Sequence, residues 1–97
     1  MHPKKKNSVY VDLFNLLNSR IKKHGYEVTT EFDGNKQEFI IENIVVKTGE
    51  VIYHKQFGYH KETQKDALIA RACEEYLMDM LEYGILLNYE SFITTTK

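Results

Sequence analysis

The most constraining feature of this chain is its middle third, where strand-like segments are separated by tight-turn signals. Between residues 26 and 32, apolar and polar side chains alternate, which is the period of a half-buried strand. Asp33-Gly34 follows at once, and both residue types accept the positive φ that a two-residue hairpin turn requires. Further strands are expected at about 36–47 and, after Thr48-Gly49, at about 50–59. The pattern predicts a three-stranded antiparallel meander.

Helices are predicted on both sides of this meander in the sequence. Over residues 9–24, apolar side chains recur at intervals of three and four, and Gly25 is placed to end the helix. The tetrapeptide Thr63-Gln64-Lys65-Asp66 is typical of a capping box, and it would start a helix that runs to about Tyr83. The order α-β-β-β-α predicts a two-layer α+β domain in which both helices cover one face of the sheet.

We expect the chain to form one domain over residues 8–84, with a basic arm at 1–7 and an apolar C-terminal tail at 85–97. The 97 residues are 42% hydrophobic and contain no repeat or compositional shift that would mark a linker. This apolar content suffices for a single core.

The cysteine and lysine content bears on where the protein works. One cysteine, Cys73, excludes an internal disulfide and any C-x-x-C motif, and it favours a reducing, cytoplasmic setting. The lysines at 4–6 are not followed by the apolar run of a signal peptide. No apolar stretch approaches the ~20 residues that cross a bilayer. We therefore expect a protein that is neither secreted by the usual route nor inserted in a membrane.

No group of residues in the sequence points to catalysis. Cys73 lies within the apolar stripe of the second helix, where a small core residue is the natural interpretation. No serine stands in a G-x-S-x-G turn, and the glycines are explained by turns and helix ends. The histidines lack a metal-site spacing; they are His2, His24, His54 and His60. We expect no enzyme, no metal, no cofactor and no small-molecule substrate.

The predicted strand register leaves apolar side chains on the sheet face away from the helices. If Thr48-Gly49 is a two-residue loop, Glu42 faces Lys55 across the second and third strands, which is a favourable pair. The far face would then carry a patch of several apolar side chains, of the size that marks an interaction site. A one-residue error in register would exchange the two faces. The predicted patch contains Ile40, Ile44, Val46, Val51, Tyr53 and Phe57.

Three occupants of this patch are open at the level of sequence. They are a second copy of the chain, another protein, or the apolar tail folding back on its own domain. The leading hypothesis is therefore a non-enzymatic interaction domain that self-associates or holds a protein partner through the apolar sheet face and the tail.

The order of elements over residues 8–83 resembles the double-stranded RNA-binding domain family. In that family, lysines at the start of the second helix hold phosphates, while the first helix and the first hairpin loop contact minor grooves. Aligning Ala67 with the alanine of the family's lysine-lysine-x-alanine-lysine motif leaves Lys65 as the one matching lysine. The turn at 33–35 also lacks the family's glycine-proline-x-histidine sequence. The resemblance implies the fold and, as an alternative function, weak nucleic-acid binding through Lys36, Lys61 and Lys65.

Charge is distributed unevenly although the net charge is −1. Residues 1–24 carry six bases and one acid, whereas residues 62–90 carry seven acids and two bases. The basic segment suits contact with phosphate or attraction to the acidic helix of the same molecule. In its size and acid-rich last helix, the chain is also similar to small proteins encoded by bacterial mobile elements and phages, which implies no particular activity.

Overall fold

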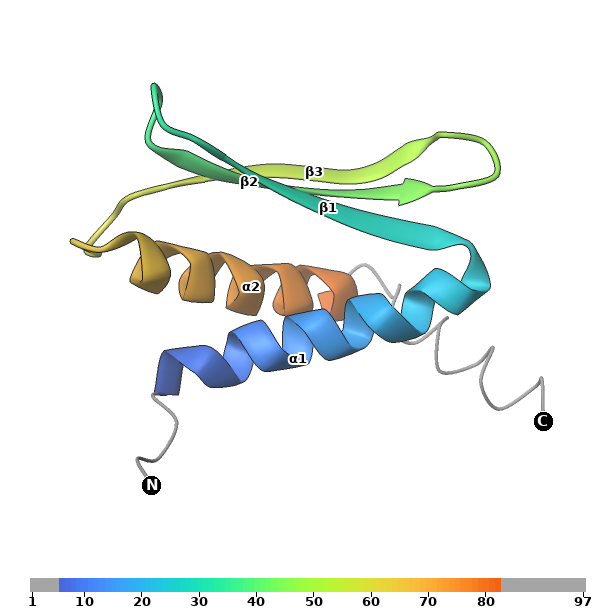
Figure 1. Ribbon diagram of the computed structural model, residues 1–97, viewed down its shortest axis with the longest axis horizontal. Helices are drawn as coiled ribbons and strands as arrows, with labels where there is room; N and C mark the ends of the chain where they lie inside the picture. The colour runs from blue at the N-terminus through green and yellow to red at the C-terminus, as the bar shows by residue number, and fades with distance from the viewer. Residues whose placement is uncertain (1–5, 83–97) are drawn as a thin grey trace.

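The computed structural model describes residues 6–82 and confirms the order α-β-β-β-α (Figure 1). The predicted apolar tail, and most of the predicted basic arm, lie outside these residues. The elements are α1 (Lys6–Ile21), the 3-10 helix η1 (Lys22–His24), β1 (Tyr26–Asp33), β2 (Glu38–Val45), β3 (Val51–Gly58) and α2 (Lys65–Glu82).

The three strands form one antiparallel sheet, and both helices pack against the same face of it. Figure 1 shows α1 and α2 side by side and running in the same direction. Helix α1 contacts β1, whereas α2 contacts β2 and β3. The predicted two-layer α+β architecture is confirmed.

The chain turns from the first helix into the sheet at Gly25. Its φ of 90° lies in the left-handed region that favours glycine, and its N–H donates to the Lys22 carbonyl at 3.2 Å. The predicted helix stop is therefore confirmed.

The first hairpin has a four-residue loop in place of the predicted two-residue turn. Asp33 accepts hydrogen bonds from the N–H groups of Asn35 at 2.9 Å and Lys36 at 3.2 Å, so its carboxylate holds the start of the loop. Gln37 takes the positive φ of 56°. The longer loop places Phe32 opposite Phe39, four residues from the predicted register. Because four is even, the predicted faces of β1 and β2 are retained.

The second hairpin differs from the predicted register by one residue. Glu42 lies opposite His54, and Lys55 lies opposite Ile41, with an irregularity between Asn43 and Ile44. The prediction that Glu42 faces Lys55 is wrong, and the β3 side chains from Tyr53 to Phe57 are exchanged between the two faces.

The observed register buries Tyr53 and Phe57 beneath the helices, leaving them 7% and 3% exposed. Burying a large apolar side chain is worth about 1.5–3 kcal/mol. The predicted Glu42–Lys55 pair would contribute at most about 1 kcal/mol. Aromatic burial therefore outweighs the charge pairing that supported the predicted register.

The core lies between the sheet and the helices and is centred on Tyr76, whose side chain is fully buried. The Phe14 and Tyr53 rings meet the Tyr76 ring edge to face, with centroids 5.2 and 5.0 Å away. The other buried members of this cluster are Phe39, Ile41, Phe57, Leu68, Ala72, Cys73 and Met80.

Candidate protein-interaction surface

The six residues of the predicted patch do not form one surface. Tyr53 and Phe57 belong to the core under α2, so their placement on the uncovered face is corrected. The cause is the one-residue register shift in β3, because neighbouring strand residues point to opposite faces.

The remaining four residues lie outside the core cluster. Ile40 and Ile44 are half-buried on the face of β2 that the helices do not cover. Val51 is 50% exposed and lies opposite Ile44, which places it on the same face. Val46, just after β2, is 54% exposed. The uncovered face therefore keeps a short aliphatic row.

Carboxylates surround this aliphatic row. Strand alternation places four glutamates on the uncovered face, and His54 is the one basic side chain that the described strands add there. The predicted register placed Lys55 on this face, so the acidic character of the face was not predicted. We call this surface the open sheet face, and its residues are Glu27, Thr29, Glu31, Asp33, Glu38, Ile40, Glu42, Ile44, Val51, His54 and Gln56.

A shallow hollow of about 130 Å³ crosses the open sheet face. Within it, Nδ1 of His54 lies 2.7 Å from Oε2 of Glu42. Carboxylates, hydroxyls and an aliphatic wall together suit a cationic side chain with an apolar stem. The hollow is lined by Thr29, Thr30, Glu31, Ile40, Glu42 and His54.

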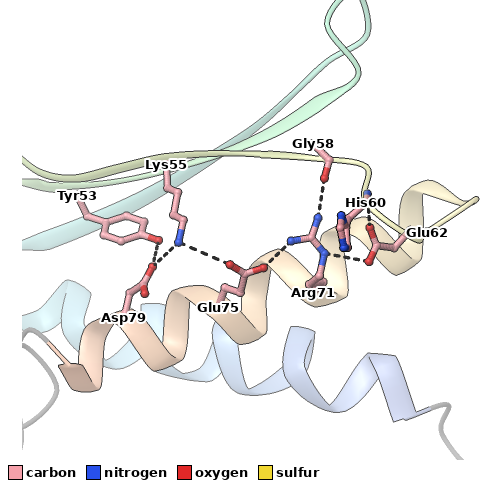
Figure 2. A network of polar contacts seen from close by, with 8 residues as sticks. All are labelled: Tyr53, Lys55, Gly58, His60, Glu62, Arg71, Glu75 and Asp79. Carbon is pink, nitrogen blue, oxygen red and sulfur yellow. Dashed lines mark hydrogen bonds and ion pairs between the residues drawn. The ribbon is translucent and has the colours of Figure 1, made fainter.

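Polar contacts join β3 to α2 on the other side of the sheet (Figure 2). The Tyr53 hydroxyl donates to Oδ2 of Asp79 at 2.7 Å, and Nζ of Lys55 donates to the same oxygen at 3.2 Å. Partial burial acts to lower the pKa of Lys55, but hydrogen bonds and charge from Asp79 and Glu75 raise it overall. Lys55 is therefore charged and tied to α2.

Arg71 extends this connection to the segment that precedes α2. Its guanidinium donates to Glu62 at 2.9 Å, to Glu75 at 2.5 Å and to the Gly58 carbonyl at 2.6 Å (Figure 2). Helical periodicity places Arg71 and Glu75 on the polar face of α2. The Arg71–Glu75 pair has the i,i+4 spacing of one helix, but Glu62 and Gly58 lie outside α2, so helical periodicity contained no signal for those two contacts.

Acid is expected to weaken the attachment of this segment. The hydrogen bond from Arg71, with a smaller one from the His60 N–H, lowers the pKa of Glu62 below its ordinary value of 4.5. A lowered folded-state pKa stabilises the protein above pH 4.5, and this stabilisation is lost as the pH falls through the folded-state pKa. Urea unfolding at a series of pH values should show a shallower acid loss for Glu62→Gln than for the wild type.

The matched control is Glu82→Gln, because Glu82 is an exposed acid of the same helix as Arg71. Its pH profile should follow the wild type more closely than the Glu62→Gln profile does. Identical profiles for Glu62→Gln and the wild type would contradict the role given to this ion pair.

Cys73 is confirmed as a core residue, with 1% exposure. Burial raises the pKa of its thiol to about 11. At pH 8, the smaller thiolate fraction alone should slow reaction with Ellman's reagent about a hundredfold relative to the unfolded chain. The rate at which thionitrobenzoate is released, with and without urea, measures this difference. Equal rates would contradict the burial of Cys73.

The lysines of the nucleic-acid alternative gather towards one end of the domain. Nζ of Lys65 lies 4.5 Å from the centroid of the Phe32 ring, so the start of α2 meets the end of β1. Lys36 belongs to the loop that follows β1, and Lys61 is exposed shortly before α2. Acids accompany them at Asp33, Glu38, Glu62 and Asp66.

Among residues 6–82, no three His, Cys, Asp or Glu side chains converge on a metal-binding arrangement. In the same range, neither long helix is apolar enough over a sufficient length to span a bilayer. Comparisons with protein-family models, with curated proteins and with solved structures find no match to this chain.

Proposed function

We propose that this chain is a non-enzymatic protein-interaction domain that binds a basic segment of another protein on the open sheet face. The observation that carries the proposal is the pairing of half-buried Ile40 and Ile44 with surrounding glutamates on a face that the described helices leave uncovered. Aliphatic side chains offer contact area, and the carboxylates select cationic partners.

Charge favours a different protein over a second copy of this chain. Two open sheet faces brought together would place glutamates against glutamates, and like charges across an interface are unfavourable. Lysine and arginine side chains avoid this cost, since their stems can pack on Ile40 and Ile44 while their charged ends reach Glu31 or Glu42.

Nucleic acid is the competing candidate, and one observation favours it. The contact of Lys65 with Phe32 brings the start of α2 to the first hairpin loop, so Lys65 and Lys36 lie towards the same end of the domain. The open sheet face itself would repel phosphate, because its charged residues are mostly acids. Nucleic-acid binding would therefore use a different surface from the one proposed.

A titration with a capped peptide of alternating lysine and valine tests the proposal. We expect the peptide to bind the full chain, and isothermal titration calorimetry at low and at moderate salt measures its affinity. Glu31→Gln should weaken it about two- to fivefold, the effect of one exposed charge pair. Glu82→Gln removes the same charge from the helical layer and is the matched control.

Two results would contradict this function. Absence of binding at low salt removes the open sheet face as a site for basic segments. Equal weakening by Glu31→Gln and Glu82→Gln would show unspecific attraction to an acidic protein. In parallel, salt-dependent binding of duplex RNA that is lost in Lys36→Ala and Lys65→Ala would favour the nucleic-acid alternative.

A further inference from the structure

The two edges of the sheet are protected to very different degrees. Edge strands expose unpaired N–H and C=O groups, and proteins usually guard them with lysine, proline or a bulge. β3 is guarded because it carries Lys55, adjoins the register irregularity and is joined to α2 through Arg71 and Asp79 (Figure 2). β1 has no lysine, proline or bulge over its eight residues.

The alternation of hydrogen-bonded pairs between β1 and β2 shows which backbone groups of β1 face outward. The Val46 N–H donates to the Gly25 carbonyl at 2.9 Å, on the same register as the β1–β2 ladder. Hydrogen-bonded and non-bonded pairs alternate in an antiparallel ladder. The odd-numbered residues of β1 therefore bond to β2, and Val28 and Thr30 direct their N–H and C=O groups to the free edge.

Side-chain charge selects what could pair with this edge. Glu27 and Glu31 lie on the open sheet face of β1, and both are exposed. Antiparallel pairing of two β1 strands centred on Thr29 would place Glu27 of each opposite Glu31 of the other, which is unfavourable. A strand with lysines at alternate positions would instead oppose each glutamate with a base.

We propose that the basic segment binds as a fourth, antiparallel strand along the free edge of β1. Its lysines lie on the open sheet face opposite Glu27 and Glu31, and its backbone bonds to Val28 and Thr30. This inference rests on the proposed function, and it names the conformation of the partner and the backbone groups that hold it.

Selective N-methylation of the lysine-valine peptide tests this geometry on the wild-type chain. Residues opposite Val28 and Thr30 are the valines, so methylating the valine amides should weaken binding about tenfold or more through the lost hydrogen bonds. Methylating the lysine amides, which point away from β1, should change binding much less. Unmodified peptide provides the reference affinity.

A pair of variants examines the same edge from the side of the protein. Thr30→Pro removes an outward N–H without removing a bond to β2, and it should weaken peptide binding about fivefold or more. Thr30→Ala keeps the N–H and should bind like the wild type. Circular dichroism and urea unfolding establish that both variants fold.

The outcomes separate this inference from the proposed function. If the valine-methylated and lysine-methylated peptides bind with equal affinity, strand addition is overturned. The proposed function, a basic segment bound on the open sheet face, would still stand. If only methylation of the lysine amides abolishes binding, the assignment of Val28 and Thr30 as the outward-facing residues of β1 is overturned. A stable dimer by light scattering that Thr30→Pro dissociates shows that a second copy occupies the edge. No binding of the unmodified peptide contradicts both proposals.

Discussion

Replacing Tyr76 with alanine is expected to lower the free energy of unfolding by about 3–5 kcal/mol, the usual cost of removing a buried aromatic ring. The side chain is fully buried, and its ring meets Phe14 and Tyr53 edge to face. It therefore joins α1, α2 and the sheet at a single point. Urea unfolding followed by circular dichroism measures the loss.

Tyr76→Phe is the matched control, because it keeps the ring and removes only the hydroxyl. Nδ2 of the fully buried Asn43 donates to that hydroxyl at 2.9 Å. Without the Tyr76 hydroxyl, the side-chain NH2 group of Asn43 loses its partner, which should lower the free energy of unfolding by about 1–3 kcal/mol. Burial also raises the pKa of Tyr76 to about 12, so the hydroxyl stays protonated at neutral pH. Equal losses for Tyr76→Phe and Tyr76→Ala would contradict the importance given to ring packing.

Phe57→Ala should also cost about 3–5 kcal/mol, whereas Val51→Ala should cost less than about 1 kcal/mol. Both residues belong to β3 and to the apolar patch predicted from the sequence. Phe57 is 3% exposed in the core, and Val51 is 50% exposed opposite Ile44. The difference between the two variants measures which residues of β3 lie beneath the helices.

The same pair of variants tests the register of the second hairpin. Urea midpoints and slopes should show a large loss of stability for Phe57→Ala at an unchanged slope. Similar small losses for both variants would support the register in which Phe57 lies on the uncovered face. Such a result would restore the larger apolar patch and weaken the case for an acidic surface.

Local signals predicted the elements well. The helix stop at Gly25 and the alternation in β1 depend on φ preferences and on side-chain period within a few residues. The length of the first loop was not predicted, because Asp33 holds the loop amides in a way that the Asp-Gly pattern does not show. The predicted faces of β1 and β2 were still correct, since the register differed by an even number of residues.

The register of β3 was decided by tertiary packing. Both alternating sets of β3 contain apolar residues, so the strand pattern favoured neither face. The two-residue turn predicted at Thr48-Gly49, with its charge pairing as support, gave the wrong register. The helical layer offers a deep site to only one set, and it buried the two large aromatic rings, Tyr53 and Phe57.

The sequence by itself determined the number, order and type of the elements and one face of the first two strands, because these depend on local conformational preference and side-chain period. The tertiary structure decided the face of β3, the acidic character of the open sheet face and the roles of Lys55 and Arg71. The physical reason is that burial and charge pairing act between segments far apart in the chain, and their balance depends on distances that exist only once the layers have packed.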